Sequence, residues 1–100
     1  METMHTERKY LFKDETPEQD FAEFIPTYLA NRREDLIVLE ESIEKYDYDK
    51  INQVCHKILG SAASYGLLRL ESLVRKLKES AVSENLTQTQ LYIKFFRNYF

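Results

Sequence analysis

The sequence is poor in the residues that interrupt helices and build tight turns. Its 100 residues include two glycines, two prolines and no tryptophan. Sheet proteins need frequent turn chemistry, and neither Asn-Gly nor Asp-Gly, the strongest short hairpin signals, occurs in the chain. This composition argues against a β-sheet fold.

Cysteine is equally scarce. The single cysteine, Cys55, cannot form a disulfide within the chain, and it excludes a metal site built from clustered cysteines. Such usage fits a reducing compartment. We therefore expect a cytoplasmic protein.

Long apolar runs are absent as well. None approaches the roughly 18 residues that span a bilayer, and the charged N-terminus has no apolar segment behind it, so we predict neither a membrane span nor a signal peptide. The net charge of −3 lacks the basic surplus that is usual in nucleic-acid-binding proteins. With 43% hydrophobic and 31% charged residues, the chain is typical of one globular domain.

Helical spacing of apolar residues dominates most of the chain. We expect a polar tail over residues 1–15 and one helical domain over residues 16–100. A short leading helix is predicted to begin at Thr16 and Pro17, a cap residue and a first-turn residue, and to be bent or broken at Pro26.

Longer helices follow this leading segment. Apolar positions three, four or seven residues apart predict helices over residues 27–46, 48–64 and 67–82, and a last one from residue 87. This last helix is expected to open with a capping box formed by Thr87 and Gln90. Short connections between the helices predict an all-α fold, an antiparallel up-and-down four-helix bundle with a short extra N-terminal helix.

The most unusual local pattern lies in the second of these long helices. His56 shares a helix face with Leu59, Gly60 and Ala63, at the edge of the predicted buried stripe. A glycine inside a helix costs about 1 kcal/mol relative to alanine, so Gly60 needs a reason other than helix stability. One reason is access, because Gly60 and Ala63 would leave room for another protein to approach the imidazole. The alternatives are an ordinary boundary histidine and small residues that serve close helix packing.

The pattern around His56 resembles a known family. The residues that carry the resemblance are His56, Ile58, Gly60-Ser61-Ala62 and Gly66, with the leucine-rich segment 67–73 after them and Asp47-Tyr48 before them. They are similar to the signature of histidine-containing phosphotransfer (HPt) domains, and the resemblance covers residues from about 20 to 100.

This resemblance implies a function and partners. HPt domains are phosphoryl carriers rather than autonomous enzymes: a ring nitrogen of the histidine exchanges a phosphoryl group with an aspartate of a response-regulator receiver domain. By the resemblance, His56 is the nucleophile and carrier, and Leu59, Gly60 and Ala63 form the docking surface for the receiver. The carrier binds no cofactor of its own, Mg²⁺ is held by the receiver, and a hybrid sensor histidine kinase is a further expected partner. We expect a monomer without nucleic-acid or membrane partners.

One position departs from the family pattern. The family usually has a lysine three residues after the histidine, where this chain has Leu59. Lys57 and Lys78 are the candidates for a replacement cation, and a merely solvated position is the alternative for each. The departure also motivates a second hypothesis, an HPt-like adaptor that binds a receiver or kinase without carrying phosphate. An autonomous enzyme or a metal-binding protein is the third alternative, and no metal site is predicted.

Overall fold

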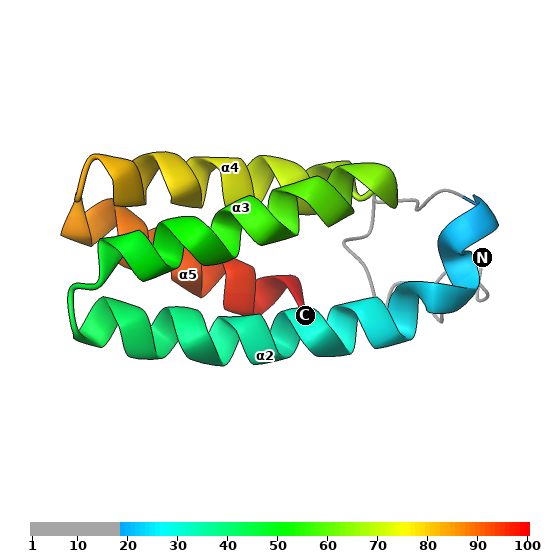
Figure 1. Ribbon diagram of the computed structural model, residues 1–100, viewed down its shortest axis with the longest axis horizontal. Helices are drawn as coiled ribbons and strands as arrows, with labels where there is room; N and C mark the ends of the chain where they lie inside the picture. Colours follow the sequence, from blue (N-terminus) through cyan, green and yellow to red (C-terminus); the bar gives the residue numbers. More distant parts are fainter. Residues whose placement is uncertain (1–18) are drawn as a thin grey trace.

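The computed structural model describes residues 19–100, and this part of the chain contains helices and no strand. The elements are a 3-10 helix, η1 (Gln19–Phe24), and four α-helices, α2 (Ile25–Glu44), α3 (Tyr48–Ser64), α4 (Leu68–Val82) and α5 (Leu86–Tyr99). The four long helices lie side by side, with the turns α2–α3 and α4–α5 at one end and the turn α3–α4 at the other (Figure 1). The predicted all-helical bundle is therefore confirmed. The predicted polar tail, residues 1–15, and the predicted helix start at Thr16 and Pro17 lie outside the described residues.

Pro26 does not break a helix as the sequence suggested. It lies in the first turn of α2, where a missing backbone N–H leaves no intrahelical hydrogen bond unmade and the fixed φ of proline suits the helix. The change of geometry comes earlier, between Phe24 and Ile25, where the 3-10 helix η1 gives way to α2.

Side-chain caps begin both α3 and α5. Asp47 caps α3, where its side chain accepts a hydrogen bond from the backbone N–H of Lys50 at 3.1 Å. The predicted capping box at the start of α5 is wrong. Asn85 is the cap, and its side-chain oxygen accepts from the backbone N–H of Gln88 at 3.0 Å, so the helix begins one residue earlier, at Leu86.

All three turns between the long helices have the same backbone design. Each has one residue in the left-handed region, with φ of 56° at Tyr46, 75° at Gly66 and 54° at Glu84. In each turn the next residue donates its backbone N–H to the carbonyl five residues earlier, at 2.8 to 3.0 Å, as in a Schellman motif. Glycine adopts this conformation at Gly66 without steric cost, in the turn that follows α3. Tyr46 and Glu84 adopt the same conformation at a steric cost that glycine avoids.

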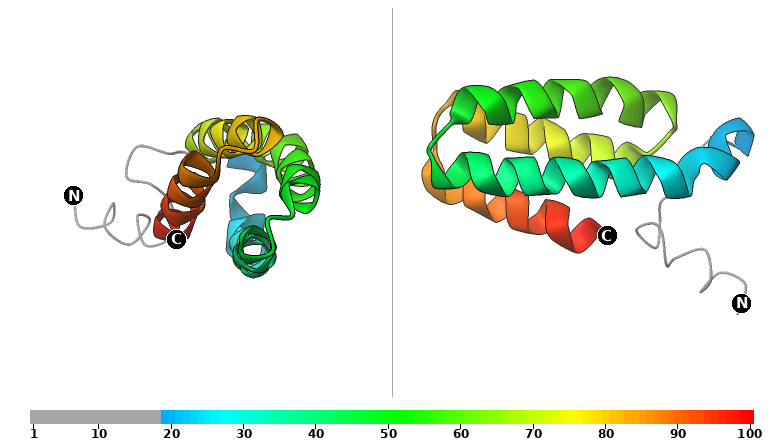
Figure 2. Two further views of the ribbon diagram at one scale, coloured as in Figure 1. Left: turned by 90° about the vertical axis from the view of Figure 1, so that its left-hand side faces the viewer. Right: turned by 60° about the horizontal axis from the view of Figure 1, so that its bottom comes forward.

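The core lies between the four helices, which surround it when the bundle is viewed along its length (Figure 2, left). The fully buried side chains come from every long helix, and the largest of them include Leu29, Leu39, Ile51, Ile58, Leu70, Leu77 and Phe96. An ion pair between Glu40 and Arg97 joins α2 to α5 at the surface. None of the helices in the described part has the length and apolar character needed to cross a membrane.

Candidate functional site

The apolar residues of α3 face the core, and their position on the helix determines which of its other residues face solvent. The apolar spacing predicts an inner stripe of six residues, of which Ile51, Val54, Cys55, Ile58 and Ala62 are buried and Tyr65 is half-buried. His56 follows Cys55 by one residue, about 100° round the helix, and its side chain is exposed. The imidazole therefore lies outside the core and is accessible to a reactant from solvent.

The small residues near His56 divide into two groups. Ser61 and Ala62 are half-buried and buried, and they allow α3 to pack closely, which is the structural alternative weighed from the sequence. Gly60 and Ala63 are exposed. A Cβ added at Gly60 would meet no atom within 4 Å, so packing inside the bundle does not require a glycine there. Packing inside the bundle therefore does not explain the missing side chain at Gly60, one turn after His56.

Leu59 is less exposed than Gly60 and Ala63, the other two residues of the expected docking surface. Its side chain is half-buried and packs against the core. The residue three positions after the histidine therefore contributes to the stability of the bundle, and only its outer part is available to a partner.

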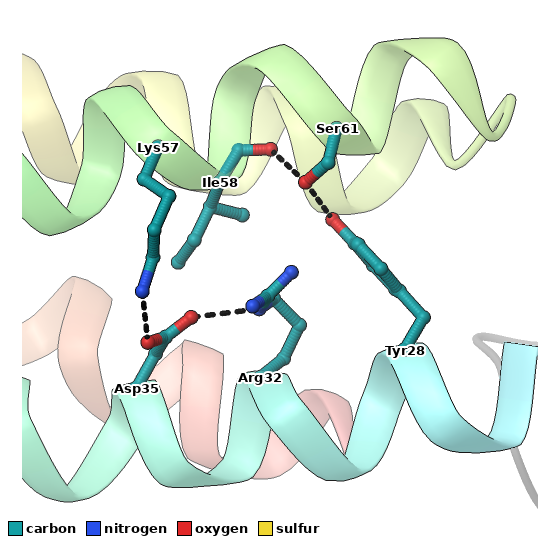
Figure 3. Close-up of polar contacts among 6 residues, drawn as sticks. All are labelled: Tyr28, Arg32, Asp35, Lys57, Ile58 and Ser61. Carbon is teal, nitrogen blue, oxygen red and sulfur yellow. Dashed lines mark hydrogen bonds and ion pairs between the residues drawn. The ribbon is translucent and has the colours of Figure 1, made fainter.

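Lys57, one candidate for a cation near the phosphoryl group, is engaged elsewhere. Its ammonium donates to Asp35 on α2 at 2.8 Å, and the Arg32 guanidinium donates to the other carboxylate oxygen at 2.7 Å (Figure 3). The Asp35 side chain is only 8% exposed, so its charge needs these partners to remain buried. Because adjacent residues of a helix do not face each other, Lys57 points to α2 rather than toward His56.

A second polar contact links the same two helices. The Ser61 hydroxyl donates to the carbonyl of Ile58 at 3.1 Å, so the Tyr28 hydroxyl is the donor in the 2.7 Å bond between Tyr28 and Ser61 (Figure 3). Arg32 lies over the Tyr28 ring, 4.6 Å from its centroid, and thereby connects this contact with the one at Asp35. These contacts set the rotation of α3 relative to α2, and with it the direction in which the His56 face of α3 points.

Lys78, the other candidate cation, is half-buried on α4. Burial raises the pKa of the Cys55 thiol to about 12, and the positive charge of Lys78 opposes this rise, as it can only from nearby. Among the neighbouring cations of α4, Arg75 is instead paired with Glu71 at 2.7 Å and Lys76 is exposed. Lys78 is therefore the α4 cation whose charge acts on Cys55, the residue before His56.

Two features of this region were not predicted from the sequence. Asp35 and its two cations could not be paired from spacing alone, because Lys57 is 22 residues away from Asp35. Asn52, one turn before His56, has a buried side-chain oxygen without a hydrogen-bond partner in the described structure. An asparagine on a helix flank is an ordinary surface residue in sequence, so nothing marked it.

The described residues contain no cluster of three or more histidine, cysteine or acidic side chains that could hold a metal ion. What the site offers is a solvent-exposed imidazole with no side chain at Gly60, one helical turn away. Comparisons of the chain with protein-family models, with curated proteins and with solved structures found no match.

Proposed function

We propose that this chain is a histidine phosphotransfer protein in which His56 carries a phosphoryl group to or from the aspartate of a response-regulator receiver domain. The observation that carries the proposal is the exposed imidazole of His56 beside Gly60, where an added side chain would meet nothing within the bundle. The resemblance of the residues around His56 to the HPt signature supports the same function. As part of this proposal, we take the fold to be an antiparallel up-and-down four-helix bundle with a short extra N-terminal helix.

The chemistry is an exchange between an acyl phosphate on the receiver's aspartate and a phosphoramidate on His56. The lone pair of one imidazole nitrogen attacks the phosphorus of the receiver's aspartyl phosphate. An N–P bond forms as the acyl P–O bond breaks, and the aspartate leaves as a carboxylate; the reverse reaction returns the group. Mg²⁺ on the receiver stabilises the charge on the transferring oxygens. In this scheme the chain is a carrier and not an autonomous enzyme, and it acts as a cytoplasmic monomer that meets a receiver and a hybrid sensor kinase.

The charge of the phosphoryl group needs a cation on the carrier side, and Lys78 is the residue that we assign to it. Lys57 already neutralises Asp35, and Leu59 packs against the core. Lys78 lies on α4, which packs against α3, and its charge acts on Cys55, the residue before His56. The phosphoryl group would therefore be stabilised by a cation of the neighbouring helix rather than of the histidine helix itself.

Transfer from receiver domains charged with acetyl phosphate tests the proposal. Radiolabel or an added mass of one phosphoryl group should appear on the protein and should be absent from His56→Ala. Lys78→Met should slow transfer about tenfold, the effect of losing one charge-assisted contact. Lys76→Met is the matched control, because Lys76 is an exposed cation on the other flank of α4, and it should leave the rate unchanged. Labelling that persists in His56→Ala would refute the assignment of the site.

The second candidate is an HPt-like adaptor that binds a receiver or kinase without carrying phosphate. It is favoured by one specific observation, the packing of Leu59 against the core where a phosphate-binding lysine is expected. Receiver binding that His56→Ala leaves intact, with no phosphohistidine formed by the unmodified protein, would select the adaptor. In the carrier, by contrast, Leu59→Lys should speed transfer if a second cation is limiting.

A further inference from the structure

A shallow groove of about 500 Å³, open to solvent, lies between helices α4 and α5 on the outside of the bundle. Its apolar lining includes Leu73, Tyr92 and Phe95. The Phe95 ring is 43% exposed and makes an edge contact with Tyr92, with 5.9 Å between the ring centroids. Arg69 and Lys76 are the charged residues of the lining, and among residues 19–100 no carboxylate contributes to it.

The groove is separate from the proposed phosphotransfer site. The groove is lined by residues of α4 and α5, and none of its lining residues belongs to α3, the helix of His56. Helix α4 lies between α3 and α5 in the bundle (Figure 2, left). Lys76 lines the groove, whereas Lys78, two residues later, projects about 200° round the helix from it.

Charge is distributed unevenly between the helices. Helices α4 and α5 carry six lysine and arginine residues and only two glutamates, with no acidic residue in α5. Helix α2 carries five acidic residues and two arginines. In a chain of net charge −3, the groove therefore lies on a locally positive half of the bundle. An acidic partner is attracted to this face and a basic one is repelled.

We propose that the groove binds an amphipathic helix of another protein, with apolar side chains on one face and acidic side chains beside them. A groove between two helices that lie side by side can hold a third helix along its length. The apolar side chains of that helix would pack against Phe95 and Leu73, and its acidic side chains would lie near Lys76. A membrane surface would require protruding apolar side chains, whereas these line a concave surface. The inference is independent of the phosphotransfer function, because it uses no residue of that site.

A synthetic peptide tests the proposal on the full chain. The probe is a fluorescein-labelled 18-residue helix with leucine at positions i, i+3, i+4 and i+7 and glutamate and alanine elsewhere; its counterpart has lysine in place of glutamate. Fluorescence anisotropy should show binding of the acidic peptide at least tenfold tighter than that of the basic one. Phe95→Ala and Lys76→Glu should each weaken binding at least tenfold, because a central aromatic anchor and a charge contact are lost.

The control is Ile37→Ala, which removes an apolar side chain of comparable exposure, 55%, from the acidic helix α2. It should leave peptide binding unchanged, and circular dichroism should show that every variant retains its helix content. The proposal is overturned if the acidic peptide fails to bind at 500 µM, or if neither groove substitution weakens it. Two other results also overturn it. One is Phe95-dependent binding to vesicles with 30% phosphatidylserine but not to the peptide. The other is a concentration-dependent dimer mass that Phe95→Ala abolishes, which would assign the groove to a second copy.

Discussion

Replacing Gly60 by alanine should make the protein more stable and, in the proposed carrier, less active. Gly60 lies within the helical run of α3, is exposed, and leaves more than 4 Å of free space around an added Cβ. The methyl group therefore causes no strain, and alanine removes the helix penalty of glycine, about 1 kcal/mol. For a domain of this size that gain corresponds to a rise in melting temperature of about 4–8 °C.

Thermal and urea unfolding, followed by circular dichroism, measure this gain directly. Gly60→Leu should be nearly as stable as Gly60→Ala, since leucine is also a good helix former and the space is open. If the bare surface serves the approach of a receiver to His56, the larger side chain should slow transfer much more than the methyl group does. Ser64→Leu, a change on the same helix but eight residues from His56, should leave transfer unchanged. A lower melting temperature for Gly60→Ala would refute the structural reasoning. Undiminished transfer by Gly60→Leu would refute the role of access.

Other predictions concern the buried thiol, the turns and the buried carboxylate. Burial raises the pKa of Cys55 from 9.0 to about 12, so the folded protein holds the thiol proton more tightly than the unfolded chain does. The contribution of this group to the free energy of unfolding is therefore fully present below pH 9 and is lost as the pH rises from 9 toward 12. Relative to Cys55→Ala, urea unfolding should show a loss of about 1.4 kcal/mol between pH 8 and pH 10, and parallel pH profiles would contradict this. Glu84→Gly should raise the free energy of unfolding by about 0.5–1 kcal/mol, because it removes left-handed strain, and a decrease would show that the turn is not strained. Asp35→Ala should cost about 1–3 kcal/mol in urea unfolding. Lys57→Met should cost less than about 1 kcal/mol, because the Lys57 side chain is 59% exposed; equal losses would contradict the asymmetry.

Most of the fold follows from patterns that are local in the sequence. Apolar spacing predicted α3 at its observed limits and the other long helices to within about two residues, since a buried stripe repeats with the helical period. The errors lie at helix ends, where several local solutions compete. Asn85 competed with Thr87 as the cap of α5, and the sequence offered acceptable chemistry at both. Pro26 was read as a break because its position relative to the first turn was unknown.

The candidate site was only partly predictable because its parts come from three helices. The exposure of His56 and Gly60 follows from their angle to the buried stripe of α3, so helix geometry alone was sufficient. The ion pair between Lys57 and Asp35 was not predictable in the same way. Asp35 is a buried acid on another helix, and neither its burial nor its distance from Lys57 can be read from spacing.

The same limit gives Leu59 a physical interpretation. A lysine at that position would have to extend from a side chain that packs against the core, so it would trade apolar contacts for a charge. In this chain the apolar contacts are kept. In the proposed carrier the cation is Lys78 of α4, the helix against which α3 packs, so the charge available to the phosphoryl group would depend on the α3–α4 interface and not on the histidine helix alone. A sequence motif confined to α3 shows the leucine but does not indicate such a cation, because Lys78 lies on the next helix of the chain.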